Sequence, residues 1–237
     1  MDYVNLIPGK LSIHTIDLIA FAWFSIAWLA YEEYTNRYSE GKENSLLMLM
    51  HRYRVDWMRQ LMRRDNRITD MTCIGNLLRS ISFFASTSIL ISLGCLSLFG
   101  YSDKMQAMIE TIPFAMASVP ILFEMKVCLL TMIFVHAFFK FTWSLRQYNY
   151  VCVYIMAAPM SYEHVETHEE YAQRGAKLMT NSARHFNLGL RAFYYGFAVV
   201  SWFIHPYAFI IATALVVGVL YRREFHSNTY HALSAKS

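Results

Sequence analysis

Four ionisable residues lie in or beside one long apolar segment, residues 120–143. They are Glu124, Lys126, His136 and Lys140. His136 and Lys140 are four residues apart and would share a helix face, and Lys126 would lie close to that face. Charges at membrane depth are costly and usually face a partner, a cavity or the interface. Two interpretations stay open: a polar path for an ion, a proton or an anionic solute, or side chains that snorkel at the segment ends.

A second group of potential ligands lies in the run EHVETHEE, residues 163–170. His164 and His168 are four residues apart, so both rings would share a helix face, and the glutamates nearby carry oxygen ligands that zinc accepts. The zincin pattern H-E-x-x-H requires a glutamate directly after the first histidine, where this chain has Val165. We interpret the run as a solvated acidic helix. His164 and His168 are weak metal candidates, and we expect no bound metal.

Charged residues also gather near the expected inner ends of the apolar segments. Arginine forms planar, bidentate pairs with carboxylates and with phosphate. Such residues could form ion pairs that lock helix ends together, or they could bind the headgroups of anionic lipids. The candidate set consists of Arg63, Asp70, Arg146, Arg191, Arg222 and Glu224.

The motifs of common enzyme classes are missing from the sequence. We find no catalytic triad pattern, no phosphate-binding loop and no G-x-G-x-x-G, and the nine glycines are scattered. The four cysteines are widely spaced without a CxxC pair, which favours unpaired apolar residues. We therefore expect no enzymatic activity and no cofactor.

The elements that must position these residues are apolar segments of membrane-spanning length. The chain has 237 residues, of which 56% are hydrophobic and 16% are charged, whereas soluble domains usually carry about 25% charged residues. About twenty apolar residues cross a hydrocarbon core of roughly 30 Å. We predict an integral membrane protein with spans at 13–34, 74–101 and 120–143.

The last apolar block breaks at His205 and Pro206. As one helix, residues 192–221 would be about 45 Å long, which exceeds the hydrocarbon thickness by half. Both ends of the block are basic. We favour a helical hairpin with legs 189–204 and 207–222, and one kinked, tilted span is the alternative.

The stretch HRYRVDWMRQLMRRDNRITD, residues 51–70, carries six arginines among aromatic and aliphatic residues. Numbered as a helix, this segment has an apolar face, although Arg54 and Arg64 interrupt it. The residues on that face are Leu46, Leu47, Met50, Tyr53, Trp57, Met58 and Leu61. A basic amphipathic helix of this kind suits the headgroup region of an anionic leaflet. Nucleic-acid binding would need a basic patch that stands free of the membrane, so we expect none.

The distribution of lysine and arginine predicts the orientation, because both concentrate in cytoplasmic loops. Residues 35–73 hold eight of them, whereas residues 1–13 and 102–119 hold one each. We therefore expect a cell inner-membrane protein with its N-terminus outside and residues 35–73 and 144–188 inside. With the hairpin, the C-terminus is cytoplasmic.

Parts of the sequence resemble a known family. The stretches are RRDNRITD (63–70), ISFFASTSILI (81–91), FFKFTWSLRQYNY (138–150) with AAP (157–159), and FNLGLRAFYYGFA…WF…P…LYRREFHS (186–227). With these, the chain resembles the DUF599 family of uncharacterised membrane proteins of bacteria and plants. The resemblance covers most of the chain from residue 55 onward. It implies the architecture of a membrane protein and no particular reaction.

We predict an all-α fold in a single transmembrane domain, residues 1–237. It is a polytopic helical bundle with an amphipathic interfacial helix and a C-terminal hairpin. The expected function is a non-enzymatic assembly, scaffold or accessory role in the inner membrane. The alternative is a small channel or transporter for ions or anionic solutes, and an enzyme that acts on lipids ranks third. Expected partners are anionic membrane lipids and either further copies of the chain or another membrane complex.

Small residues are frequent in the second predicted span. In a membrane, small side chains let helix backbones approach closely. We therefore expect Ala85, Ser86 and Gly94 to pack against another helix rather than against lipid.

Overall fold

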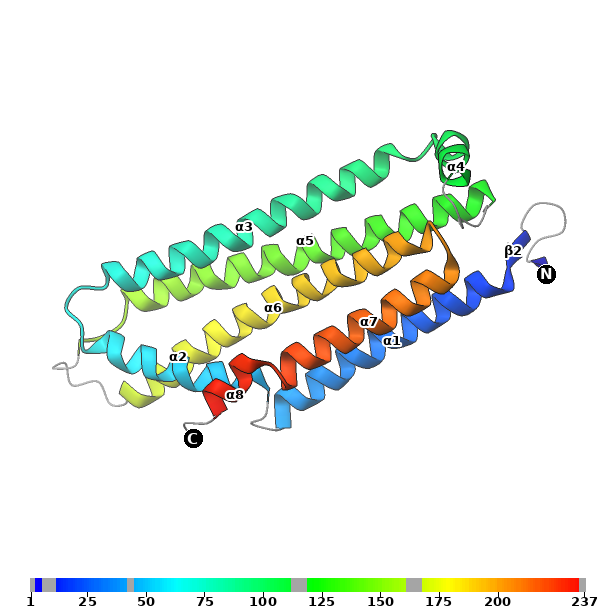
Figure 1. Cartoon of the computed structure of the whole chain (residues 1–237). Helices are drawn as coiled ribbons and strands as arrows, with labels where there is room; N and C mark the ends of the chain where they lie inside the picture. The colour runs from blue at the N-terminus through cyan, green and yellow to red at the C-terminus, as the bar shows by residue number, and fades with distance from the viewer. Residues whose placement is uncertain (1–2, 6–11, 42–44, 112–118, 161–167, 235–237) are drawn as a thin grey trace. The chain divides into compact units, whose positions relative to one another are not determined.

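The structure, a computed structural model, describes residues 3–5, 12–41, 45–111, 119–160 and 168–234. Within these residues the regular secondary structure is helical except for a short antiparallel pair, β1 (Tyr3–Asn5) and β2 (Ser12–His14). The helices, labelled in Figure 1, are α1 (Thr15–Gly41), α2 (Leu46–Met62), α3 (Ile68–Ser97), α4 (Ser102–Glu110), α5 (Pro120–Met156), α6 (His168–Trp202), α7 (Pro206–Phe225) and α8 (Asn228–Ser234). The predicted all-α class is confirmed for the described part of the chain.

Three of these helices, α1, α3 and α5, are long and apolar enough to cross a membrane. They coincide with the three spans predicted at 13–34, 74–101 and 120–143. The third helix continues to Met156 and stops shortly before Pro159, because proline cannot continue a helix. Its 37 residues are about 56 Å long, which is more than a hydrocarbon core requires.

The last apolar block is divided into two helices. The first of them, α6, ends at Trp202, and α7 begins at Pro206, where a proline suits the first turn of a helix. The ring of Trp202 stacks on that of Phe209 across this break, with 4.8 Å between the ring centroids. The helix break was predicted at His205 and Pro206. That the two helices form a hairpin within a membrane stays a prediction.

The chain contains two compact units, each assembled from distant parts of the sequence. The first unit comprises residues 1–36, 88–136 and 191–221, and the second comprises residues 37–87, 137–190 and 222–237. Helices α1, α3, α5, α6 and α7 each contribute a segment to both units. The single-domain organisation stays a prediction.

Aromatic rings fill the core of the first unit. Phe24 of α1 lies against Tyr195 of α6 and Phe209 of α7, and Trp28 stacks on Tyr195 with 4.6 Å between the centroids. These residues come from three helices, so burial of their rings holds the unit together.

The core of the second unit is also aromatic. Phe84 of α3, Phe141 of α5 and Phe186 of α6 contact one another, with centroids 5.6–5.9 Å apart. Gly189 lets α6 approach α5 closely, because a Cβ at this position would lie 2.5 Å from the Phe141 ring. The absence of a side chain at Gly189 therefore allows the close contact between these two helices.

The predicted small-residue face of α3 is only partly buried in the chain itself. Ala85 is buried, as are Ser88 and Ser92, whereas Ser86 and Gly94 are exposed. Contact of Ser86 and Gly94 with another helix thus requires a second molecule and stays a prediction. The four cysteines are free, as expected.

The amphipathic segment forms helix α2, whose N-cap Ser45 accepts a hydrogen bond from the Met48 amide. The apolar residues Leu47, Met58 and Leu61 are buried, in agreement with the predicted face. Tyr53, predicted on the same face, is 40% exposed. The location of α2 at a membrane interface stays a prediction.

Candidate functional site

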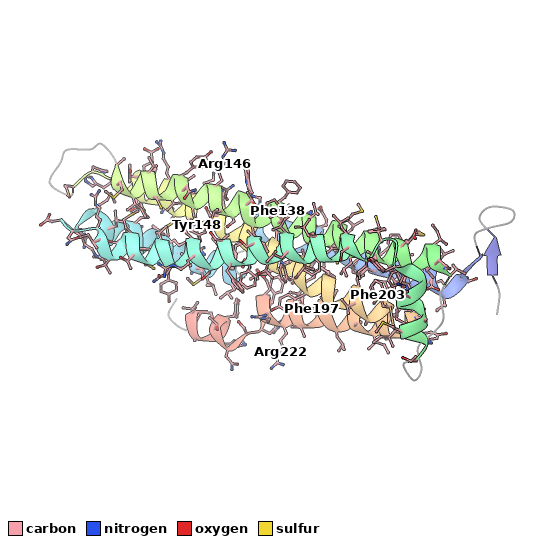
Figure 2. The ribbon with its side chains drawn as sticks, turned by 90° about the horizontal axis from the view of Figure 1, so that it is seen from above. Phe138, Arg146, Tyr148, Phe197, Phe203 and Arg222 are labelled. Atoms are coloured by element: carbon pink, nitrogen blue, oxygen red, sulfur yellow. The ribbon has the colours of Figure 1, made fainter. Side chains whose placement is uncertain are left out.

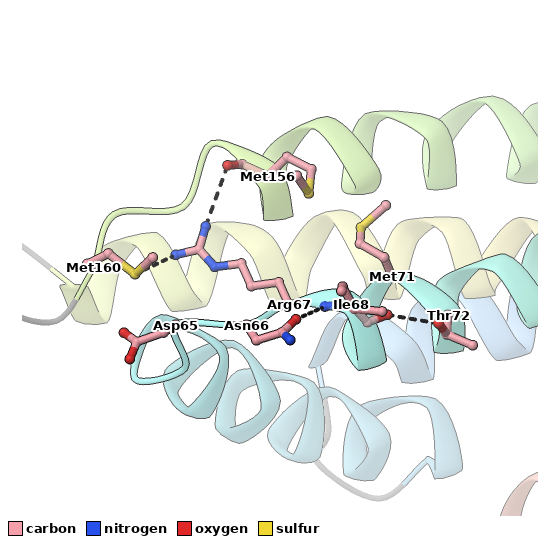
Figure 3. A pocket seen from close by; sticks show the side chains of 8 residues that line it. All are labelled: Asp65, Asn66, Arg67, Ile68, Met71, Thr72, Met156 and Met160. Atoms are coloured by element: carbon pink, nitrogen blue, oxygen red, sulfur yellow. Dashed lines mark hydrogen bonds between the residues drawn. The ribbon is translucent and has the colours of Figure 1, made fainter.

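The turn between α2 and α3 is the first candidate, because it lies in the RRDNRITD stretch. The side-chain oxygen of Asn66 accepts a hydrogen bond from the Ile68 amide at 2.9 Å, which satisfies a free donor at the start of α3. Figure 3 shows this contact together with the other residues of the turn. The hydrogen bond between Asn66 and Ile68 therefore stabilises the local geometry of the turn.

Asp70 is the buried acid of this turn, with only 2% of its surface exposed. Its Oδ1 accepts hydrogen bonds from Trp57 Nε1 at 2.6 Å and from Arg64 at 2.7 Å. Arg64 is 47% exposed, so the ion pair is partly buried. The carboxylate also lies in the first turn of α3, where the helix dipole favours a negative charge. Asp70 thus joins α2, the turn and α3.

Arg67 extends from the turn to the end of α5. Its guanidinium donates to the carbonyl oxygens of Ile155 at 3.0 Å and Pro159 at 3.3 Å. The last carbonyls of a helix lack partners within the helix, and a basic side chain can satisfy them. A cavity of about 650 Å³ lies beside Arg67 (Figure 3). Because Arg67 is engaged with the backbone, we interpret this turn as a structural junction.

Contacts between α2 and α6 form a second cluster in the second unit. Arg59 binds both oxygens of Glu169, at 2.6 and 2.8 Å, and also pairs with Asp56. Hydrogen bonds from Arg59 and from Gln173 lower the pKa of Glu169 to about 2. These groups are exposed, so their contribution to stability is small.

Deeper between the same two helices lies Thr180, which is buried. Its hydroxyl accepts a hydrogen bond from Arg54 at 3.2 Å and lies 3.0 Å from Nδ1 of His51. Burial and the charge of Arg54 lower the pKa of His51, and the carbonyl of Ala176 opposes this shift. Arg54, one of the two arginines that interrupt the predicted apolar face, therefore has a buried partner on α6.

A buried charged cluster lies in the first unit. Lys126 is 3% exposed and donates to the carbonyl oxygen of Trp202 at 3.1 Å. Its ammonium lies 3.8 Å from Asp17, which in turn accepts a 2.7 Å hydrogen bond from the Trp202 indole. Lys126, predicted on a polar path, therefore has partners on α1 and α6.

The other two residues of the predicted path are half-buried. The ring of His136 lies edge-on to Trp28, with 6.1 Å between centroids. Lys140 belongs to the second unit. A continuous path along Lys126, His136 and Lys140 stays a prediction.

Members of the predicted charge cluster have separate partners. Asp70 pairs with Arg64 rather than with the neighbouring, exposed Arg63. Arg146 donates to the Tyr150 hydroxyl one turn away, and Arg191 donates to Thr35 of α1.

The remaining two members lie near the C-terminus, where Arg222 is exposed and Glu224 is half-buried. Figure 2 shows Arg146 and Arg222 at different edges of the molecule, both pointing away from the ribbon. A shared headgroup site of all six residues stays a prediction.

The weak metal candidates are only partly described. His164 lies outside the described residues, and Nε2 of His168 lies 3.2 Å from the Met160 carbonyl oxygen. Within the described ranges, no three or more His, Cys, Asp or Glu side chains are grouped so that they could hold a metal.

One family model, described as "Protein of unknown function, DUF599", matches residues 19–229. No curated protein and no solved structure matches the chain.

Proposed function

We propose a function from one premise, that the chain belongs to the DUF599 family. In this proposal the protein serves as a non-enzymatic assembly, scaffold or accessory protein of a cell inner membrane, embedded through its apolar helices. The N-terminus lies outside and α2 lies at the cytoplasmic surface, in contact with anionic lipids.

One observation carries this proposal: the polar side chains of the RRDNRITD stretch make structural contacts. Asp70 accepts hydrogen bonds from Trp57 and Arg64, and Arg67 caps α5. A catalytic group needs a reactive atom that substrate can reach. These groups instead join α2, α3 and α5, which supports an architectural role.

A face for partners is available on α3. Phe83, Leu90 and Leu93 are 56–67% exposed, and Ser86 and Gly94 lie exposed among them. In a membrane, lipid would cover part of this face. The small residues would let a helix of another molecule approach α3 closely. The proposal therefore predicts a stable complex after extraction from native membranes.

The test compares two substitutions on α3. The full chain is purified in mild detergent, its mass is measured by light scattering, and co-purifying proteins are identified by mass spectrometry. We expect an oligomer or a stoichiometric partner, and its loss in Ser86→Leu, where the larger side chain prevents close approach. Leu90→Ala, which shortens an exposed side chain on the same face and leaves room for close approach, is the control and should keep the complex. A wild-type protein that is monomeric and without a partner would reject the proposal.

A second candidate, a channel or transporter, is favoured by the buried Lys126–Asp17 pair. Ionisable residues within membrane helices often mark ion or solute pathways. Flux of protons and small anions into proteoliposomes tests this function, with His136→Ala as the variant. Wild-type flux that falls in the variant supports it, and flux equal to that of empty liposomes rejects it.

A further inference from the structure

A basic cavity of about 600 Å³ lies between α2 and α6 in the second unit. This volume falls in the range of small-molecule sites. Its polar lining residues include His51 from α2 and, from α6, Gln173, Arg174, Lys177, Asn181 and Arg184. None of these residues belongs to the charge cluster predicted from the sequence.

The spacing of the α6 residues explains why they share one wall. Arg174, Lys177, Asn181 and Arg184 follow one another at steps of three or four residues, which places them on one face of a helix. The row from Arg174 to Arg184 spans about 15 Å at the helical rise. The wall therefore presents donors along its whole length.

The charge of this wall is strongly positive. Arg174, Lys177 and Arg184 line the cavity, and no acidic residue is among the described residues that line it. Arg174 pairs with Glu170 at the exposed rim, at 2.9 Å. An anion in the cavity would be attracted by all three of these positive charges.

Thr180 is a buried residue of the cavity lining. It is 6% exposed and holds both His51 and Arg54 of α2 through its hydroxyl. This part-buried contact joins the imidazole of His51 to α6. The lining thus combines neutral donors with the charges of longer side chains.

We propose that this basic cavity binds a phosphate group. Lysine acts as a point charge and arginine as a planar fork for phosphate oxygens, and the amides of Gln173 and Asn181 and the hydroxyl of Thr180 add neutral donors. A tetrahedral anion with several oxygens can use donors from more than one direction. The phosphate can belong to a lipid headgroup or to a soluble phosphate compound.

The experiment uses the full chain in neutral detergent and chloride buffer at constant ionic strength. In one arm short-chain phosphatidylglycerol is titrated, with short-chain phosphatidylcholine as the comparison. In the other arm glycerol phosphate and inorganic phosphate are titrated. Binding is followed by the shift in melting temperature and by broadening of the ³¹P resonance.

We expect wild-type protein to bind at least one of these probes. Lys177→Gln and Arg184→Gln should each weaken binding by about tenfold or more, because each removes a charge-assisted hydrogen bond. Lys177→Arg should retain most of the affinity. Arg79→Gln, which removes an exposed arginine of the same unit outside the cavity, should bind as the wild type does.

The two arms distinguish the source of the phosphate. Binding of phosphatidylglycerol alone supports a lipid headgroup, and binding of glycerol phosphate or inorganic phosphate supports a soluble ligand. Absence of binding in both arms overturns the proposal. An equal loss in Arg79→Gln also overturns it, because that result would indicate attraction to the general charge of the surface. Circular dichroism of each variant shows that any loss occurs in folded protein, and Arg184→Gln keeps the test valid if Lys177→Gln fails to fold.

Discussion

Asp70 illustrates how one buried residue determines the role of several others. Its Oδ1 accepts from both Trp57 and Arg64, so an indole and a guanidinium from α2 and the following turn meet at one atom. In the part of the chain that the structure describes, the second oxygen, Oδ2, is buried without a hydrogen-bond partner. The stabilising effect is therefore concentrated in two hydrogen bonds, and one of them depends on the negative charge.

Replacement of Asp70 by Asn tests this role. The amide oxygen can still accept from Trp57, but Arg64 loses its counter-charge. Because the ion pair is half-exposed on the Arg64 side, we expect a loss of about 1 to 3 kcal/mol, between the values for exposed and buried pairs. Unfolding by SDS in mixed micelles measures this loss. Asp56→Asn, which breaks an exposed pair with Arg59, is the control and should cost less than about 1 kcal/mol. Equal effects of the two variants would contradict the assignment.

His51 gives a prediction about pH. Burial and Arg54 lower its pKa below the ordinary value of 6.5, and Arg174, Lys177 and Arg184 line the same cavity from α6. In the unfolded chain the ring takes up a proton near pH 6.5, whereas in the folded chain it does so at lower pH. His51 therefore contributes stability above pH 6.5, and this contribution is lost as the pH falls toward its folded pKa.

The measurement is a pH titration of the His51 ring resonance in chloride buffer, assigned with the His51→Gln variant. We expect a midpoint below 6.5. A midpoint at or above 6.5 would mean that the imidazole is solvated or paired with an acid, and the described contact with Thr180 would then be wrong.

At the scale of elements, close helix approach depends on single glycines. A Cβ on Gly189 would lie 2.5–2.8 Å from atoms of the Phe141 ring, and Phe141 is fully buried. Gly94 on α3, in contrast, has open space where its Cβ would be. The two positions make a matched pair, because both are glycines within long helices.

We expect Gly189→Ala to destabilise the protein by about 1 to 2 kcal/mol. An overpacked core costs about 1 to 3 kcal/mol, and the higher helix propensity of alanine recovers up to about 1 kcal/mol. Gly94→Ala should be neutral or stabilising by the same propensity. The free energies of unfolding of the two variants decide the matter, and a Gly189→Ala protein more stable than the wild type would show that α5 and α6 are not in close contact.

The elements were largely predictable because each depends on local composition. The lengths of the apolar runs predicted α1, α3 and α5, and Pro206 predicted the break before α7. The partners of Arg54 and Arg64 were not predictable, although both residues were visible as interruptions of an apolar face. Thr180 lies 126 residues from Arg54, and only the packing of α2 against α6 brings the two together. Long-range pairs of this kind require the tertiary structure.

The same reason explains the charge cluster and the basic cavity. Arg191 was grouped with Asp70 because both lie at the end of an apolar run, yet it donates to Thr35 of α1. The row Arg174, Lys177 and Arg184 was visible in the sequence as a set of charges in a polar segment. Only the structure shows that these residues line a cavity together with His51, which lies more than a hundred residues away along the chain.

At the scale of the whole molecule, the distribution of charge predicts an orientation in the membrane. Residues 35–73 carry eight lysines and arginines, and residues 1–13 and 102–119 carry one each. Basic loops are retained on the cytoplasmic side. Arg222 and Arg223 follow the apolar part of α7, so the end of that helix should also be cytoplasmic. With α6 and α7 as two legs, the chain would cross the membrane five times.

Reporter fusions test this orientation. We expect a fusion after residue 110 to report the outside, and fusions after residues 65 and 230 to report the cytoplasm. The fusion after residue 65 is the control, because it lies within the arginine-rich segment that dominates the charge asymmetry. An outside signal at residue 230 would replace the hairpin with one kinked span, since an odd number of further crossings would then follow α5. A cytoplasmic signal at residue 110 would reverse the whole orientation, and the basic cavity between α2 and α6 would then face phosphate compounds outside the cell.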